Sequence, residues 1–252
     1  MKIAVSDLAF TGFKAKELEK LPNKYGIEFF YEFGKNSYWD NILEQIGKNR
    51  SIQFSMHAPC VSVNLANTED TEYLGIFRKA IVYAQRCKAE FLVIHTNEQW
   101  SGEKSAVQEL VLGKIKKIIE MAADYQVRIL IENVGLKTKG TLLFDWGEYQ
   151  KLLKKLPKAR ALLDVGHAHI NGWNISECIK TLDSRLWAIH LHDNDGKKDQ
   201  HLAIGEGNIG WDKVFAAIKG LGPDTRLILE YANIDMSRLL DNIKLIEKEF
   251  LA

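Results

Sequence analysis

The chain has 252 residues, of which 46% are hydrophobic and 27% charged, and its formal net charge is +1. This length and apolar content suit one α/β barrel with a full core better than two ordinary domains. The near-zero net charge excludes a strong overall field that would attract nucleic acid or an anionic membrane. Asp7 interrupts the N-terminal stretch too early for a signal peptide, and no apolar run approaches membrane-spanning length, so we expect a soluble, cytoplasmic protein.

Short apolar runs alternate with amphipathic stretches of helical period along the chain, as in repeated βα units around a parallel sheet. The predicted strands are Lys2–Ser6, Ile27–Glu32, Ile52–Met56, Phe91–His95, Arg128–Glu132, Ala161–Asp164, Leu186–His190 and Arg226–Glu230. The predicted helices are Lys14–Tyr25, Trp39–Lys48, Thr71–Cys87, Lys104–Tyr125, Asp145–Leu156, Asn174–Leu182, Trp211–Ile218 and Asp235–Phe250. No linker-like tract interrupts the series, so the sequence predicts one (β/α)8 TIM barrel domain over residues 1–252.

Ionisable residues stand at the ends of most predicted strands. His95, Glu132, Asp164, His190 and Glu230 each end a strand, and His57 directly follows another. In a parallel barrel these strand ends converge on one mouth, where active sites of this architecture are built. Buried carboxylates and imidazoles are costly unless they are neutralised, hydrogen-bonded or bound to metal, so the joint pattern predicts a divalent metal site.

The other histidines map to the same mouth. His167 and His169 follow Asp164, His192 follows His190, and His201 lies in the longest loop, Asp193–Gly210. We exclude His169 and His192 from the ligand set, on the argument that alternate positions on a strand or turn face opposite ways, so that His192 points away from His190. A set of imidazoles and carboxylates suits Zn²⁺, Mn²⁺, Fe²⁺ or Co²⁺.

The three cysteines are too few and too scattered for a disulfide framework or a thiolate zinc site. We expect Cys60, Cys87 and Cys178 to be small buried or half-buried residues.

Seven fragments carry a resemblance to a known family. They are MHAP at Met56–Pro59, VIH at Val93–His95, IEN at Ile131–Asn133, LDVGH at Leu163–His167, HLHD at His190–Asp193, DQHLAIGEGNIG at Asp199–Gly210 and LILE at Leu227–Glu230. In order and spacing, over nearly the whole chain, the sequence resembles the xylose isomerase-like barrels, which include sugar isomerases and epimerases and the AP endonucleases of the endonuclease IV type.

The isomerase and epimerase branch implies one metal, with Glu132, Asp164, His190 and Glu230 in the positions of its four ligands. Its partner would be a small sugar or sugar phosphate. Glu132 and Glu230 would exchange protons with this substrate through an enediolate, while His167 would hydrogen-bond a substrate hydroxyl.

The endonuclease IV branch implies three zinc ions on nine ligands. By motif these fall on His57, His95, Glu132, Asp164, His167, His190, Asp199, His201 and Glu230, so that a multinuclear zinc phosphodiesterase is the alternative function. In the isomerase reading, His57, His95, His167, Asp199 and His201 are additional ligands of metal or substrate.

Two departures favour the isomerase reading. Endonucleases of this type follow HAP with a Tyr-Leu wedge that enters DNA, whereas this chain has Cys60 and Val61. The basic residues of the predicted mouth loops are also few for a duplex ligand, namely Lys35, Lys137, Lys139, Lys197 and Lys198. We therefore do not expect nucleic acid as the partner. A barrel that binds a small molecule without turnover is disfavoured by the intact pair Glu132 and Glu230.

Some features keep two interpretations. Trp100, Trp173 and Trp211 either pack in the core or form an apolar wall against a sugar, and Lys197 and Lys198 either face solvent or meet a substrate phosphate. The substrate, the identity and number of metal ions, and a homo-oligomeric state stay open.

Overall fold

Eight parallel strands close into a barrel in chain order, with β1 pairing to β8. The computed structural model describes residues 2–10, 15–47 and 53–251. The strands are β1 (Lys2–Ser6), β2 (Gly26–Phe30), β3 (Phe54–His57), β4 (Leu92–Ile94), β5 (Ile129–Glu132), β6 (Arg160–Asp164), β7 (Leu186–Leu191) and β8 (Arg226–Leu229). The predicted (β/α)8 TIM barrel is confirmed.

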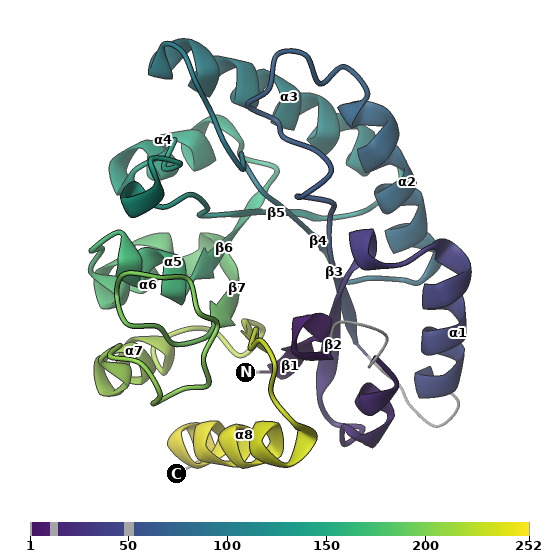
Figure 1. The fold of residues 1–252 in the computed structure, drawn as a ribbon, viewed down its shortest axis with the longest axis vertical. Helices are drawn as coiled ribbons and strands as arrows, with labels where there is room; N and C mark the ends of the chain where they lie inside the picture. Colours follow the sequence, from purple (N-terminus) through teal and green to yellow (C-terminus); the bar gives the residue numbers. More distant parts are fainter. Residues whose placement is uncertain (1, 11–14, 48–52, 252) are drawn as a thin grey trace.

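Helices surround the strands in chain order (Figure 1). They are α1 (Asn36–Gly47), α2 (Tyr73–Arg86), α3 (Lys104–Asp124), α4 (Trp146–Lys155), α5 (Val165–Ile170), α6 (Ile175–Leu182), α7 (Trp211–Ile218) and α8 (Met236–Leu251). Most begin or end within one to three residues of the predicted bounds, and the six-residue helix α5 was not predicted. No helix in the described part of the chain is long and apolar enough to cross a membrane.

One predicted helix is wrong in type. Where the sequence predicts a helix over Lys14–Tyr25, the structure has a short 3-10 helix, Ala15–Lys20. Pro22 explains the early end, because a proline disfavours the helical conformation of the residue before it, here Leu21. The predicted boundary residues Lys14, Lys48 and Ile52 lie outside the described residues.

Two apolar layers separate the inside of the barrel from its outside. The inner layer consists of Ala4, Phe91, Val93, Leu130, Leu162, Ala188 and Ile228, and a much larger layer packs the strands against the helices. Because residues two apart on a strand share a face, the residues two positions beyond this inner layer also point into the barrel. At the carboxyl ends these positions include His95, Glu132, Asp164, His190 and Glu230, so the pleat itself directs them to one mouth.

Candidate metal centre

Four of the strand-end residues surround one point at the mouth. The Nδ1 atom of His190 lies 3.4 Å from Glu230 Oε2, 3.7 Å from Glu132 Oε2 and 3.8 Å from Asp164 Oδ2. All four residues are buried, at 3% exposure or less. His190 Nδ1 has no hydrogen-bond partner among the described residues, although three carboxylates face it.

Glu28, in the middle of β2, fixes the ring of His190. Its carboxylate accepts a hydrogen bond from His190 Nε2 at 2.7 Å and another from Ser55 Oγ at 2.8 Å. With Nε2 as the donor, the neutral ring has its lone pair on Nδ1, the atom that faces the three carboxylates. A carboxylate behind a histidine is the usual outer support of a metal ligand. Glu28 was not predicted from the sequence, although a glutamate at an inward position of an otherwise apolar strand is a signal for such a role.

A second group lies beside the first and shares Glu132. His57 Nε2 and His95 Nε2 are 3.1 Å apart, and each is 3.3 Å from Glu132 Oε2. His57 Nδ1 lies 2.8 Å from the carbonyl oxygen of Ala58, and His95 Nδ1 lies 2.5 Å from Glu98 Oε1. Both rings therefore present Nε2 to the mouth.

The long loop after β7 delivers Asp199 and His201. Asp199 Oδ2 lies 3.2 Å from His167 Nε2 and 3.3 Å from His201 Nε2. His167 is held from behind by the carbonyl oxygen of Asn133, 3.1 Å from its Nδ1. Asp199 Oδ1 is buried and finds no hydrogen-bond partner in the described ranges. The structure thus gathers all nine candidate ligands at one mouth.

Asp193 anchors this loop at its start. Its Oδ2 accepts hydrogen bonds from Gly205 N at 2.9 Å and from Trp211 Nε1 at 2.8 Å, and its Oδ1 accepts from Ile209 N at 3.2 Å. Gly207 passes so close that a Cβ there would lie 2.3 Å from Asp193 Oδ1. One buried carboxylate therefore fixes the path that brings Asp199 and His201 to the mouth.

The expectation for His192 is wrong. His192 is fully buried, and its Nε2 lies 2.9 Å from Asp164 Oδ2, the oxygen that also faces His190. Residues two apart on an extended segment share a face, and β7 extends to Leu191, so His190 and His192 point the same way. Gly166 leaves room for the ring, since a Cβ there would lie 2.0 Å from His192 Cε1.

His169 lies outside this cluster. Its Nε2 is 2.6 Å from Asn208 Oδ1, on the partly exposed side of the loop. Its exclusion from the candidate ligands agrees with this position.

The pKa values of the two glutamates of the first group are shifted in opposite directions. Burial raises the pKa of Glu230 to about 7, and the lowering effect of His190 and His201 only partly offsets it. Burial would also raise the pKa of Glu132, but His95 and His190 outweigh it and hold that pKa well below its usual range. Metal-free, the site thus contains one firmly ionised carboxylate and one that accepts a proton near neutrality.

The residues of the mouth line a cavity of about 410 Å³. Its apolar wall contains Leu8, Phe30, Phe33, Val61, Val134 and Leu136, and Lys139 is the lysine among the described lining residues. A larger cavity of about 530 Å³ lies at the opposite end, next to Arg128, Trp187 and Arg226, away from all the candidate ligands.

Of the two interpretations of the tryptophans, core packing is the one that the structure supports, since none of the three is among the described residues that line the mouth. Trp211 packs in the core and donates to Asp193, and Trp173 packs against Trp146. Trp100 is partly buried and does not line the cavity either. Lys197 and Lys198 are likewise not lining residues; their backbone N–H groups donate to Asp195 Oδ1.

The donor set fits divalent metal. Four groups of potential ligands have their atoms within 4.8 Å of one another: His192, His201 and Glu230; Glu28, His190 and Glu230; Glu132, Asp164 and His167; and His57, Cys60 and His95. The orphaned atoms His190 Nδ1, His192 Nδ1 and Asp199 Oδ1 all belong to this region. Buried polar atoms rarely lack partners, and cations placed among these groups would supply them.

The chain is similar in sequence to several known proteins. The chain is 30% identical over 203 residues to the uncharacterized protein MJ1311 of Methanocaldococcus jannaschii, covering 76% of this chain and 69% of that protein. It is 28% identical over 179 residues to a probable endonuclease 4 of Mycoplasma capricolum, covering 62% and 60% of the two chains.

Solved structures share the whole fold. A D-tagatose 3-epimerase-like protein superposes with a TM-score of 0.83 at 24% identity over 100% of both chains. The IOLI protein, whose structure holds a zinc atom, superposes with a TM-score of 0.80 at 18% identity over 99% of this chain and 98% of that one. The xylose isomerase-like TIM barrel family matches residues 5–250, and the chain belongs to this family.

Proposed function

We propose that this protein is a metal-dependent isomerase or epimerase of a small sugar or sugar phosphate. The observation that carries the proposal is the placement of two buried carboxylates, Glu132 at the end of β5 and Glu230 directly after β8, with His190 Nδ1 lying 3.7 and 3.4 Å from them. The similarity to a D-tagatose 3-epimerase-like protein supports the reading.

Glu132, Asp164, His190 and Glu230 would hold the catalytic metal, drawn from Zn²⁺, Mn²⁺, Co²⁺ or Fe²⁺. When bound, such a cation polarises a carbonyl and its neighbouring hydroxyl and so acidifies the C–H bond that they share. Glu28 keeps the His190 ring oriented toward that position through its hydrogen bond at 2.7 Å. The surrounding wall of Phe30, Phe33 and Val61 excludes water from one side of a sugar.

Proton transfer falls to the two glutamates. One carboxylate removes the proton from the substrate carbon, and the other delivers a proton to the resulting enediolate. In an epimerisation the two act on opposite faces of the same carbon. His167, which lines the cavity 3.2 Å from Asp199, is placed to hydrogen-bond a substrate hydroxyl.

The test is exchange of substrate protons with solvent deuterium. We expect the metal-loaded protein to incorporate deuterium next to the carbonyl of a ketose or ketose phosphate. Glu132→Gln and Glu230→Gln keep the side-chain shape but remove the carboxylate, so each should retain the fold and lose about 10²–10⁴-fold in rate. Glu109→Gln, on the exposed face of α3, is the matched control and should retain the rate. Near wild-type exchange in either site variant would remove that residue from the acid/base role.

Zinc-dependent phosphodiester hydrolysis is the second candidate. His57, His95, Asp199 and His201 favour it, because they complete nine potential ligands at one mouth, and so does the similarity to a probable endonuclease 4. Three tightly bound zinc ions per chain together with cleavage of abasic duplex DNA would establish this function instead. We expect fewer than three tightly bound ions and no cleavage.

A further inference from the structure

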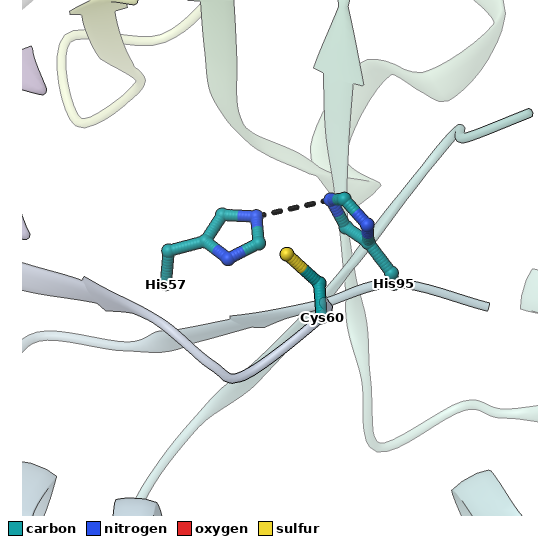
Figure 2. A group of neighbouring side chains, drawn as sticks. All are labelled: His57, Cys60 and His95. Atoms are coloured by element: carbon teal, nitrogen blue, oxygen red, sulfur yellow. Dashed lines mark hydrogen bonds between the residues drawn. The ribbon is translucent and has the colours of Figure 1, made fainter. Parts of the chain in front are cut away.

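The loop after β3 places a cysteine against the second group of ligands. Cys60 is 6% exposed and lies three residues after His57. One ligand atom from each of His57, Cys60 and His95 lies within 4.8 Å of the others. Figure 2 shows the Cys60 sulfur directed between the two imidazole rings.

Both imidazoles present Nε2 to the same side, next to this sulfur. The carbonyl oxygen of Ala58 can only accept, so His57 Nδ1 carries the proton of the 2.8 Å hydrogen bond. The Glu98 carboxylate accepts a hydrogen bond from His95 Nδ1 in the same way, at 2.5 Å. The two Nε2 atoms then lie 3.1 Å apart, a hydrogen-bond distance that a proton on one of them accounts for in the apoprotein and that a metal ion can bridge once it replaces this proton.

The spacing matches one tetrahedral ion. With bonds of about 2.0–2.1 Å to zinc, neighbouring N or O ligands of a tetrahedron lie about 3.3 Å apart. The three separations among His57 Nε2, His95 Nε2 and Glu132 Oε2 are 3.1, 3.3 and 3.3 Å. These atoms form one face of such a tetrahedron, and the Cys60 sulfur lies within 4.8 Å of a nitrogen of each imidazole.

We propose that His57, His95, Glu132 and Cys60 bind a zinc ion, with the Cys60 thiolate as the fourth ligand. The three cysteines are indeed too dispersed for a zinc site built of thiolates, but a single thiolate suffices in a mixed set with two imidazoles and a carboxylate. The centre is additional to the proposed catalytic metal. Glu132 takes part in both: its Oε2 faces His57 and His95 and also lies 3.7 Å from His190 Nδ1, while its Oε1 lies 3.4 Å from His167 Nδ1.

Binding requires loss of the thiol proton. Without a cation, burial and the neighbouring carboxylates raise the pKa of the Cys60 thiol, so the apoprotein carries the neutral form. A dication reverses that local balance, and formation of the metal–sulfur bond releases one proton to solvent. The soft thiolate also favours Zn²⁺, Co²⁺ or Cd²⁺ over Mn²⁺ or Mg²⁺.

Four protein ligands close the coordination sphere. Catalytic zinc sites keep one position open for water or substrate, whereas four-coordinate protein sites are structural. The ion at Cys60 would therefore fix the loop after β3 and the position of Glu132, and it would not generate a hydroxide nucleophile.

The experiment uses Co²⁺ as a spectroscopic probe of the full-length protein after its metals are removed. We expect a near-ultraviolet sulfur-to-cobalt charge-transfer band in the wild type and its loss in Cys60→Ser. Cys87→Ser makes the same atomic change at a half-buried position next to Met56 and should retain the band. X-ray absorption of the zinc form should show a zinc–sulfur distance of about 2.3 Å that only Cys60→Ser abolishes.

Affinity gives a second readout. We expect Cys60→Ser to weaken the tightest zinc binding by more than the roughly 10–100-fold that loss of an outer partner costs. A charge-transfer band that survives in Cys60→Ser, or a zinc form with N and O ligands alone, would overturn the proposal. Circular dichroism of Cys60→Ser and Cys60→Ala identifies any loss of fold. Because ligand identity is measured without substrate, a failed deuterium exchange leaves this result unaffected, and the reverse also holds.

Discussion

Glu28 offers a sharp test of the metal centre, because it supports the site without facing the cavity. Replacing Glu28 by Gln keeps the size of the side chain and an oxygen that can accept the hydrogen bond from His190. The change removes one negative charge from a fully buried position whose hydrogen bond to His190 Nε2 is 2.7 Å long. The metal-bound state should lose more stability from this change than the apoprotein.

In the metal-bound state the charge makes His190 a better ligand. Loss of such an outer partner typically costs about 10–100-fold in metal affinity, which corresponds to about 1.4–2.7 kcal/mol. Burial would lower the pKa of His190 in the apoprotein, but Glu230, Glu28 and Glu132 hold it well above its usual range, so Glu28 has an attractive partner there. Burial raises the pKa of Asp7 to about 8, and Glu28 adds to that rise, so the same charge also has an unfavourable neighbour. Glu28→Gln should therefore change the free energy of unfolding of the apoprotein by less than it changes the free energy of metal binding.

Competition with a chromophoric chelator measures the affinity, and thermal unfolding of the apoprotein measures the stability. Ser55→Ala is the matched control, because it removes the 2.8 Å hydrogen bond to Glu28 but leaves the charge in place, so its affinity should fall less. If Glu28→Gln binds zinc as tightly as the wild type, His190 is not a metal ligand oriented by this carboxylate.

Two further predictions concern the packing and loading of the site. Gly166→Ala places a Cβ 2.0 Å from His192 Cε1, so we expect the fold to lose about 1–3 kcal/mol and metal binding to weaken. Gly113→Ala is the control, because a Cβ there has nothing within 4 Å and should not destabilise the fold. Equal thermal midpoints for the two variants would contradict this packing. Removing the metal with a chelator should lower the thermal midpoint, because an ion present at 1,000 times its Kd stabilises the fold by about 4 kcal/mol. For a chain of this size, each kcal/mol of stability shifts the midpoint by about 2–4 °C. An unchanged midpoint in a scan of the fully loaded and stripped forms would argue against a tightly held ion.

Many residues of the mouth could be predicted because the position of a residue along a barrel strand determines which way its side chain points and at which end of the barrel it lies. An ionisable residue at the end of an apolar strand, such as Glu132 or Asp164, has only one place to go once the strands are parallel and closed. The same rule places His190 and His192 on one face, because residues two apart on a strand point the same way. The expectation for His192 was wrong because it assigned these two residues to opposite faces.

Glu28 shows the other kind of limit. Its partner His190 is 162 positions away in the sequence, and strands β2 and β7 meet only across the inside of the closed barrel. No local sequence motif or hydrophobic periodicity predicts a contact between residues so far apart in the chain. The prediction for Cys60 has the same limit. The sequence predicts a small buried residue, and Cys60 is buried, but its neighbour His95 directly follows β4, the next strand along the sheet, and this contact could not be predicted from the local sequence.

The loop after β3 also bears on the choice between a sugar and a DNA duplex. Glu32 accepts hydrogen bonds from the backbone N–H groups of Cys60, Val61 and Ser62, at 3.0, 2.9 and 2.5 Å. Burial would raise the pKa of Glu32, but these hydrogen bonds outweigh it and lower the pKa, so the carboxylate stays ionised.

A duplex that approached this mouth would meet that charge as well as those of Glu98 and Asp199, with Lys139 as the cation among the described cavity-lining residues. Phosphate binding gains its free energy from several lysine or arginine contacts, each of which releases counterions. Val61 is 75% exposed at the tip of the loop, but it has no ring that could stack in a gap between bases. A small polar ligand requires neither the positive field nor the wedge. It needs donors and acceptors within a cavity of about 410 Å³, which the imidazoles and carboxylates of this mouth supply.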